Sequence, residues 1–238
     1  MRADKLLASL GYGSRKDVKK LLKQGALSVN GDIVKDPKTH VDEYEDEFEV
    51  FGEPAVYRKY IYLMMNKPPG VISATEDETE ETLSDLLEEE DRFFEPFPVG
   101  RLDKDTTGLV LMTNDGKWAH RLMSPNRHVD KIYRVHLAHP VGEKEAEACR
   151  KGLTLDDGYV TKPADLDLFG KEEADVVHLT IREGKYHQVK RMFAALGNHV
   201  ERLKREKIGG VQLDPELEPG MYRELTEEER SLLSGEND

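Results

Sequence analysis

Short apolar segments that end at proline or glycine are the strongest constraint on this 238-residue sequence. Residues 61–66 form one such segment, and Pro68-Pro69-Gly70 follows it closely, where proline cannot continue a central strand. Residues 109–112 form a second, preceded by a polar loop between two glycines. Residues 131–138 and 176–182 read as further strands, and 131–138 alternates apolar and polar side chains as a half-buried strand does. The middle of the chain therefore predicts a sheet of short strands.

The length allows one large domain or two smaller ones, and we expect two. No apolar run approaches the ~18 residues that a membrane span needs, and the charged amino terminus lacks the apolar stretch of a secretory signal. A single cysteine, Cys149, excludes an internal disulfide and Cys-rich metal sites. These features predict a soluble cytoplasmic protein that does not associate with membranes.

The formal net charge of −13 is unevenly distributed. Residues 1–42 hold nine basic and five acidic side chains, and residues 182–207 hold eight and three. Most of the excess acid lies in residues 76–95 and 214–238. Because attraction to phosphate depends on local clusters within a Debye length of ~8–10 Å, the acidic average does not exclude a nucleic-acid partner.

The amino-terminal segment predicts two short helices and a hairpin. Residues 3–10 suit the first helix, and Ser14 with Asp17 three positions later resembles a capping box that begins the second. Gly25 suits the end of that helix. Asn30-Gly31 between short alternating segments indicates a tight hairpin turn.

One face of the second helix is strongly basic. At ~100° per residue, its basic side chains fall within an arc of ~140°, opposite Val18, Leu21 and Leu22. The five are Arg15, Lys16, Lys19, Lys20 and Lys23. An ordinary solvated helix surface is the alternative interpretation. The run from Arg2 to Gly31 resembles the S4 RNA-binding domain, which implies that structured RNA binds here. The residues that we expect to contact RNA in this module are Arg2, Lys5, Ser14, Arg15, Lys16, Lys19, Lys20 and Lys23.

Two acidic stretches separate the functional segments. Residues 43–60 suit a strand end and a linker, so we place the S4 domain and its linker at 1–56 and a second domain at 57–238. Residues 75–95 carry Leu83, Leu86 and Leu87 at helical spacing, which predicts a surface helix without chemistry.

Three segments carry candidate chemistry. Asp103 lies in the polar loop before the strand at 109–112, where a carboxylate can be held rigidly, although aspartate is also common in turns. Tyr133 shares a strand face with Val135 and Leu137, and a core tyrosine is the alternative. A helical stripe in residues 183–197 leaves His187, Lys190 and Arg191 on other sides. The alternative interpretation is a pair of solvated bases and a histidine that caps the helix.

Together these segments resemble the pseudouridine synthases of the RsuA branch, which act on small-subunit ribosomal RNA. The motifs are MNKPPGVIS at 65–73, GRLDKDTTGLVLMTNDG at 100–116, KIYRV at 131–135 and EGKYHQVKRMFAALGNHV at 183–200. The resemblance implies an α+β fold in which an S4 domain precedes a catalytic domain with a mixed, mostly antiparallel sheet flanked by helices.

The same resemblance implies the roles of the site residues. Asp103 would be the catalytic aspartate, Tyr133 the active-site tyrosine and Lys190 the basic partner of the aspartate, with Arg191 as the fallback. Arg101 would hold the RNA open around the displaced base. We also expect His187 and Arg191 to contact RNA, and no cofactor or metal is required.

The expected partner is 16S ribosomal RNA or an assembling small-subunit particle, bound by a monomer. The WAHR segment at 118–121 and the lack of a long basic tail after Gly220 favour this branch over a large-subunit rRNA synthase. A non-catalytic ribosome-assembly RNA-binding protein is a further alternative. A glycoside hydrolase would need paired carboxylates and does not explain the basic segments, and the histidines lack the spacing of a metal site.

Overall fold

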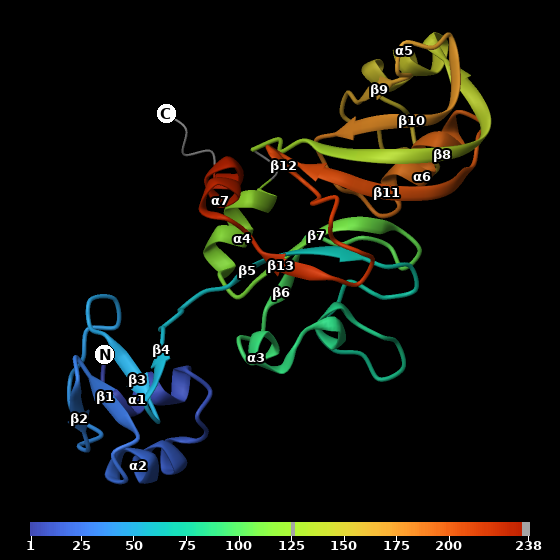
Figure 1. The fold of residues 1–238 in the computed structure, drawn as a ribbon. Helices are drawn as coiled ribbons and strands as arrows, with labels where there is room; N and C mark the ends of the chain where they lie inside the picture. Colours follow the sequence, from blue (N-terminus) through green and yellow to red (C-terminus); the bar gives the residue numbers. More distant parts are fainter. Residues whose placement is uncertain (125–126, 235–238) are drawn as a thin grey trace. The chain divides into compact units, whose positions relative to one another are not determined.

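The computed structural model divides the chain into two compact units, residues 1–60 and 61–238, and each is described by itself (Figure 1). The structure describes residues 1–124 and 127–234. The last residues of the predicted second domain, 235–238, therefore lie outside the described part. The division falls after residue 60, whereas the sequence places it after residue 56.

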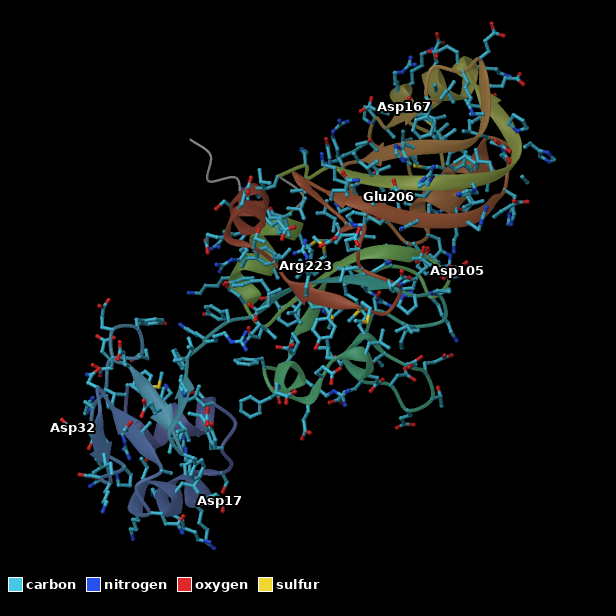
Figure 2. The ribbon with its side chains drawn as sticks, viewed as in Figure 1. Asp17, Asp32, Asp105, Asp167, Glu206 and Arg223 are labelled. Atoms are coloured by element: carbon cyan, nitrogen blue, oxygen red, sulfur yellow. The ribbon has the colours of Figure 1, made fainter. Side chains whose placement is uncertain are left out.

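The first unit packs two helices against a four-stranded antiparallel sheet with the order β2-β1-β3-β4. Its elements are α1 (Ala3–Ser9), α2 (Arg15–Lys23), β1 (Leu27–Val29), β2 (Asp32–Val34), β3 (Phe48–Val50) and β4 (Glu53–Ala55). Ser14 and Asp17 form the predicted capping box at the start of α2, where Asp17 is labelled in Figure 2. Asn30 and Gly31 have φ of 51° and 85°, as the predicted hairpin turn requires.

The prediction of a strand end and linker for residues 43–60 is wrong over its middle part. A second hairpin, β3–β4, lies there and completes the sheet by pairing Phe48 with Val29 of β1. Phe48 and Val50 are buried in the core of the unit with Leu6, Leu22 and Leu27. The acidic composition of the segment conceals this short apolar alternation.

The described part of the second unit forms a nine-stranded sheet with the path β13-β5-β7-β11-β8-β10-β9, in which β6 also pairs with β7 and β12 with β11. The strands are β5 (Tyr62–Lys67), β6 (Phe97–Val99), β7 (Thr107–Thr113), β8 (Lys131–Gly142), β9 (Asp165–Asp167), β10 (Glu173–Ile181), β11 (Val200–Ile208), β12 (Val211–Gln212) and β13 (Tyr222–Glu224). The helices are η1, a 3₁₀ helix (Leu83–Leu86), α3 (Glu89–Arg92), α4 (Gly116–Met123), α5 (Glu143–Lys151), α6 (Gln188–Ala195) and α7 (Glu227–Ser234). Only the β7–β11 pair is parallel among these strands, so the expectation of a mixed, mostly antiparallel sheet is confirmed.

The strand β8 and the helix α6 bury the faces that the sequence predicts. Tyr133, Val135 and Leu137 on β8 are buried in one core cluster with Met192 and Phe193 of α6. Figure 1 shows α6 against the part of the sheet formed by β8, β10 and β11. This packing fixes the start of α6, where His187 lies, relative to the strand that carries Tyr133.

The single surface helix predicted for residues 75–95 is wrong. Within the segment, Thr82 forms a bridge to Ile72, and the short helix η1 and the separate helix α3 follow. The Asp85 carboxylate accepts from the backbone N–H and the hydroxyl of Thr82, which favours a short capped turn over a continuous helix. Leu83 and Leu87 are buried, so core packing decides the path of the chain here.

Candidate active site

The loop that carries Asp103 connects β6 to β7 and is held by a buried serine. The Ser73 hydroxyl donates to the Leu102 carbonyl at 2.9 Å and accepts from the Leu102 N–H at 3.0 Å. One side chain thus satisfies both backbone polar groups of the residue before Asp103. The Asp103 carbonyl accepts from the Thr106 N–H at 3.1 Å, which closes a turn over the loop.

A buried lysine holds the other end of the same loop. Lys67, at the end of β5, is 0% exposed, and its Nζ donates to the carbonyls of Pro68, Lys104 and Thr106 at 3.0, 3.1 and 2.9 Å. Burial lowers the pKa of Lys67 to about 8, although the Asp105 and Asp103 carboxylates oppose this shift. Two of the three bonds end on the loop, so Lys67 fixes the backbone that presents Asp103.

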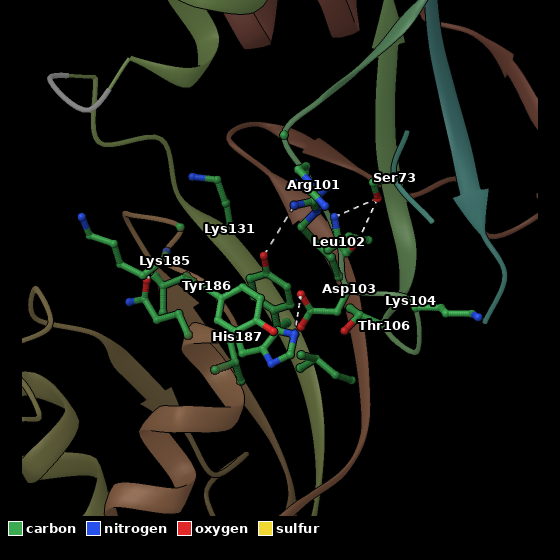
Figure 3. Close-up of a pocket in the computed structure, with 18 of the residues that line it drawn as sticks. Ser73, Arg101, Leu102, Asp103, Lys104, Thr106, Lys131, Lys185, Tyr186 and His187 are labelled. Atoms are coloured by element: carbon green, nitrogen blue, oxygen red, sulfur yellow. Dashed lines mark hydrogen bonds and ion pairs between the residues drawn. The ribbon is translucent and has the colours of Figure 1, made fainter. Parts of the chain in front are cut away.

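Asp103 opens into a cavity of about 650 Å³ (Figure 3). Arg101, Tyr133 and His187 also line it, so the structure brings together these four residues that the sequence selects. Arg101 is exposed, whereas Tyr133 is only 7% exposed. Cavities that hold small organic ligands fall in this size range, so the space suits one extruded nucleotide base.

Two cationic or ionisable side chains approach the Asp103 carboxylate. His187 Nε2 lies 3.6 Å from Oδ1, and Lys190 Nζ lies 3.5 Å from Oδ2. Lys190 makes a shorter contact with Asp105, whose Oδ1 accepts from Nζ at 2.5 Å. This hydrogen bond lowers the pKa of Asp105. Lys190 therefore bridges two carboxylates of one loop and binds the nearer one more directly.

His187 is placed by an unusual backbone conformation just before α6. Its φ of 48° lies in the left-handed region, and its side chain makes no capping hydrogen bond to the helix. The imidazole instead stacks on the exposed ring of Tyr186, with centroids 3.8 Å apart and planes at 16°. Both residues line the cavity, which gives it an aromatic rim.

Arg191 lies outside the described lining of the cavity. Its Nε donates to Asp156 at 2.6 Å, and its Nη2 pairs with Asp157 at 2.7 Å. These partners raise the pKa of Arg191 and hold the side chain away from Asp103. The structure thus brings Lys190, and not Arg191, to the aspartate.

The predicted RNA-binding residues of the first unit differ in their availability. The five basic side chains of α2 line one hollow, opposite the buried Val18 and Leu22. Ser14 is used by the capping box, and the Arg2 guanidinium makes two hydrogen bonds to Asp4, at 3.0 and 2.7 Å. Lys5 is exposed. The α2 face is therefore the best formed cationic surface of this unit.

Sequence reasoning missed several buried or cavity-lining polar residues. Arg205 lines the cavity at 2% exposure, Lys67 and Ser73 hold the loop, and Tyr186 forms the rim. Strand alternation could have predicted that Arg205 is buried, because it lies two residues after the buried Leu203 and therefore on the same face of the strand. Lys67 ends an apolar strand and directly precedes Pro68-Pro69. A polar residue at such a strand end is a weaker indication of burial than the alternation that marks Arg205.

Within residues 1–124 and 127–234, no group of three or more His, Cys, Asp or Glu side chains is arranged to hold a metal ion. The described helices also include none with the length and apolar character needed to cross a membrane.

Comparison with known proteins agrees with this arrangement. Residues 61–195 match the family model described as RNA pseudouridylate synthase, and residues 1–46 match the S4 domain. The chain belongs to the RNA pseudouridylate synthase family, and it is an RNA pseudouridine synthase with an amino-terminal S4 domain.

Individual relatives align over nearly the whole chain. The chain is 54% identical to the uncharacterized RNA pseudouridine synthase YtzG of Bacillus subtilis, over 98% of both chains. It is 44% identical to ribosomal small subunit pseudouridine synthase A of Escherichia coli, over 96% of this chain and 98% of the relative. A crystal structure of a pseudouridylate synthase superposes with a TM-score of 0.68 at 42% identity, covering 98% of this chain and 99% of that one.

Proposed function

We propose that this enzyme converts one uridine of small-subunit (16S) ribosomal RNA to pseudouridine, with Asp103 as the catalytic group. The observation that carries the proposal is the Asp103 carboxylate on a braced loop, open to a cavity of about 650 Å³ and approached by Lys190. The relatives named as small-subunit synthases support the choice of RNA, since they align from end to end at 42–46% identity.

The reaction needs an ionised carboxylate at the sugar. Conversion of uridine breaks the N1–C1′ bond, turns the uracil and joins its C5 to C1′, with no redox change and no loss of atoms. Asp103 can attack C1′ or remove the C2′ proton, and the Lys190 ammonium lies 3.5 Å from its carboxylate. No step requires a cofactor.

Tyr133 acts on the flipped uracil, and Arg101 acts on the stacked RNA from which the uracil is removed. The Tyr133 ring faces the cavity, where it stacks against the uracil and its hydroxyl takes part in moving the C5 proton. Because the reacting atoms lie inside stacked RNA, the nucleotide must be flipped out at a cost of a few kcal/mol. The exposed Arg101 at the cavity mouth fills the gap.

The S4 unit supplies a second, electrostatic contact. Five cations on α2 attract phosphates without reading bases, and His187 at the cavity contacts the RNA near the reacting nucleotide. We propose further that the protein acts in the cytoplasm as a monomer, on 16S rRNA or on an assembling small-subunit particle. Gel filtration with light scattering tests the oligomeric state.

Tritium release tests the function directly. RNA labelled at uridine C5 loses tritium to water when C5 bonds to C1′, so the protein is incubated with unmodified 16S rRNA, unmodified 23S rRNA and assembling small-subunit particles. We expect release from 16S rRNA or the particle, and none with the Asp103→Asn variant. Release from 23S rRNA alone would reassign the enzyme to the large subunit, and binding without release from any RNA would favour a non-catalytic protein.

A further inference from the structure

Arg205 is a buried cation without a carboxylate partner. Its side chain on β11 is 2% exposed, and Nε donates to the Leu109 carbonyl at 2.8 Å. Nη1 lies 3.5 Å from the Tyr133 hydroxyl, which is a long hydrogen bond. Nη2 is buried and makes no hydrogen bond within the described part of the chain, and none of the ion pairs found there includes Arg205. Burying an unpaired charge is costly, so such a group is expected where a function needs it.

A second unpartnered polar atom lies in the wall of the same cavity. Thr106 is 1% exposed, and its hydroxyl has no hydrogen-bond partner among the described residues. The parallel pairing of β7 with β11 places Gly108 beside Arg205, and Thr106, two residues earlier, lines the same cavity as Arg205. A Cβ at Gly108 would lie 2.2 Å from the Arg205 carbonyl oxygen, so glycine permits this close approach.

The wall around Arg205 is electropositive. Lys131, two residues before Tyr133, also lines the cavity, and burial together with the Arg205 charge lowers the pKa of its amine. Two cationic side chains and two hydroxyl groups, those of Tyr133 and Thr106, therefore line one region of the cavity. Such a surface suits an uncharged ring that becomes negatively charged during the reaction.

We propose that the Arg205 guanidinium, in the wall of the cavity with the Thr106 hydroxyl beside it, stabilises the negative charge that the flipped uracil gains when its bond to the ribose breaks. This inference rests on the proposed function, and it assigns the positive charge that stabilises the leaving group. The guanidinium is fixed in advance by Leu109 and Tyr133, so its charge needs no rearrangement as the bond breaks.

The electron balance gives the same anion by either route. If Asp103 attacks C1′, a carboxylate electron pair forms the O–C1′ bond and the N1–C1′ pair passes to the uracil. If Asp103 takes the C2′ proton, the C2′–H pair forms a C1′=C2′ bond and the N1–C1′ pair again passes to the uracil. The charge spreads over N1, C5, O2 and O4. When C5 bonds to C1′, the O–C1′ electron pair returns to Asp103 in the first route, and in the second route the C1′=C2′ pair takes the proton back from Asp103 at C2′. The C5 proton then leaves to water, and N1 takes up a proton. Arg205 stabilises the same anion in both cases, so the inference does not depend on the route.

The first test compares arginine variants on the two faces of the sheet. Arg205→Met is expected to lower the single-turnover rate on the RNA that the wild type modifies by about 10²–10³-fold, with RNA affinity within about threefold of wild type. Arg205→Lys should retain part of the rate. The matched control is Arg134→Met, which removes an exposed arginine next to Tyr133 in β8 and should change the rate by less than about twofold.

The second test distinguishes stabilisation of the leaving group from a structural role. Fluorine at C5 stabilises the uracil anion, so RNA with 5-fluorouridine at the target position needs less help to break its N1–C1′ bond. The loss caused by Arg205→Met should then be about tenfold smaller on 5-fluorouridine than on uridine, measured as disappearance of the starting nucleoside by mass spectrometry. Equal losses on both substrates would overturn the inference, because a merely structural arginine would slow both alike.

A hydroxyl variant keeps the test decisive if Arg205→Met does not fold. Thr106→Val preserves the side-chain shape, and it should show the same difference between the two substrates with a smaller rate loss. Equal activity of Thr106→Val and wild type on uridine, together with full activity of Arg205→Lys, would also overturn the inference. A wild type inactive on every RNA would instead refute the proposed function, and the leaving-group role would fall with it.

Discussion

The Lys190 ammonium lies 3.5 Å from the Asp103 carboxylate and, at the same time, 2.5 Å from that of Asp105. One cation therefore serves two carboxylates that are two residues apart in one loop. The Asp103 side chain is 28% exposed and that of Asp105 72%, so the charge on Asp103 is less well screened by water. The two aspartates provide a matched comparison of roles.

Replacement of each aspartate by asparagine should separate catalysis from loop structure. Asp103→Asn removes the nucleophile or base, so we expect the single-turnover rate of tritium release to fall by at least about 10³-fold with RNA affinity near wild type. Asp105→Asn removes only the competing partner of Lys190 and should retain at least about a third of the rate. Comparable losses in both variants would mean that the loop, and not the Asp103 carboxylate, sets the activity.

The titration of Asp105 should depend on Lys190. The hydrogen bond from Lys190 lowers the pKa of Asp105 below its ordinary value of 3.8, so the stabilisation is present above that value and is lost as the pH falls through the lowered pKa. Lys190→Met should move the titration midpoint of the Asp105 carboxyl carbon upward, measured by NMR. Lys190→Arg keeps the positive charge and serves as the control. An unchanged midpoint in Lys190→Met would show that the contact does not persist in solution.

Lys67 should give the stability of the enzyme an alkaline dependence. Its pKa of about 8 lies below the ordinary 10.5, so the penalty for burying the ammonium is full below pH 8. Between pH 8 and 10.5 the folded state loses the proton while the unfolded state keeps it, so the Lys67 contribution to the free energy of unfolding rises with pH, by at most about 3 kcal/mol.

Urea unfolding of wild type and Lys67→Met at several pH values measures this contribution. The variant leaves three carbonyls without their donor and should be less stable at each pH. The stability difference between wild type and variant should widen from pH 8 to 10. Lys144→Met, which removes an exposed lysine on α5, should show no such trend. A constant difference for Lys67→Met would indicate that Lys67 keeps an ordinary pKa.

Local periodicity was sufficient to predict the elements that carry the site. The alternation at 131–138 placed Tyr133 on the buried face of β8, and the apolar stripe at 183–197 left Lys190 off the core, where it reaches Asp103. The capping box at Ser14 was readable because both of its residues lie within one helical turn. These features depend on interactions between near neighbours in sequence.

The features that were missed depend on partners distant in sequence. In the sequence, Arg205 is one of several basic residues in the segment 182–207. Its place in the cavity wall with Tyr133 follows only from the pairing of β11 with β8 and β7. Residues 75–95 have the composition of a solvated helix, but burial of Leu83 and Leu87 determines their course. The sequence predicts that Lys190 pairs with Asp103 alone. The turn closed by the Thr106 N–H and the Asp103 carbonyl also brings Asp105 to Lys190, and the sequence does not show this turn.

The cationic face of α2 should contribute affinity for RNA without affecting the chemical step. Lys16 and Lys20 lie one turn apart on this face and line its hollow. Replacing both by alanine should weaken binding of the substrate RNA and reduce the slope of log affinity against log salt by about 1–2, since each lost phosphate contact removes about 0.7–0.9. The single-turnover rate at saturating RNA should remain within about twofold of wild type.

A control variant removes the same charge from another helix. Lys144 and Lys151 are exposed on α5, and their replacement by alanine changes the net charge equally. If phosphate contacts at α2 are specific, only the α2 variant shows the reduced slope. Equal slopes for the two variants would assign the effect to overall charge, and an unchanged slope in the α2 variant would show that RNA does not contact this face.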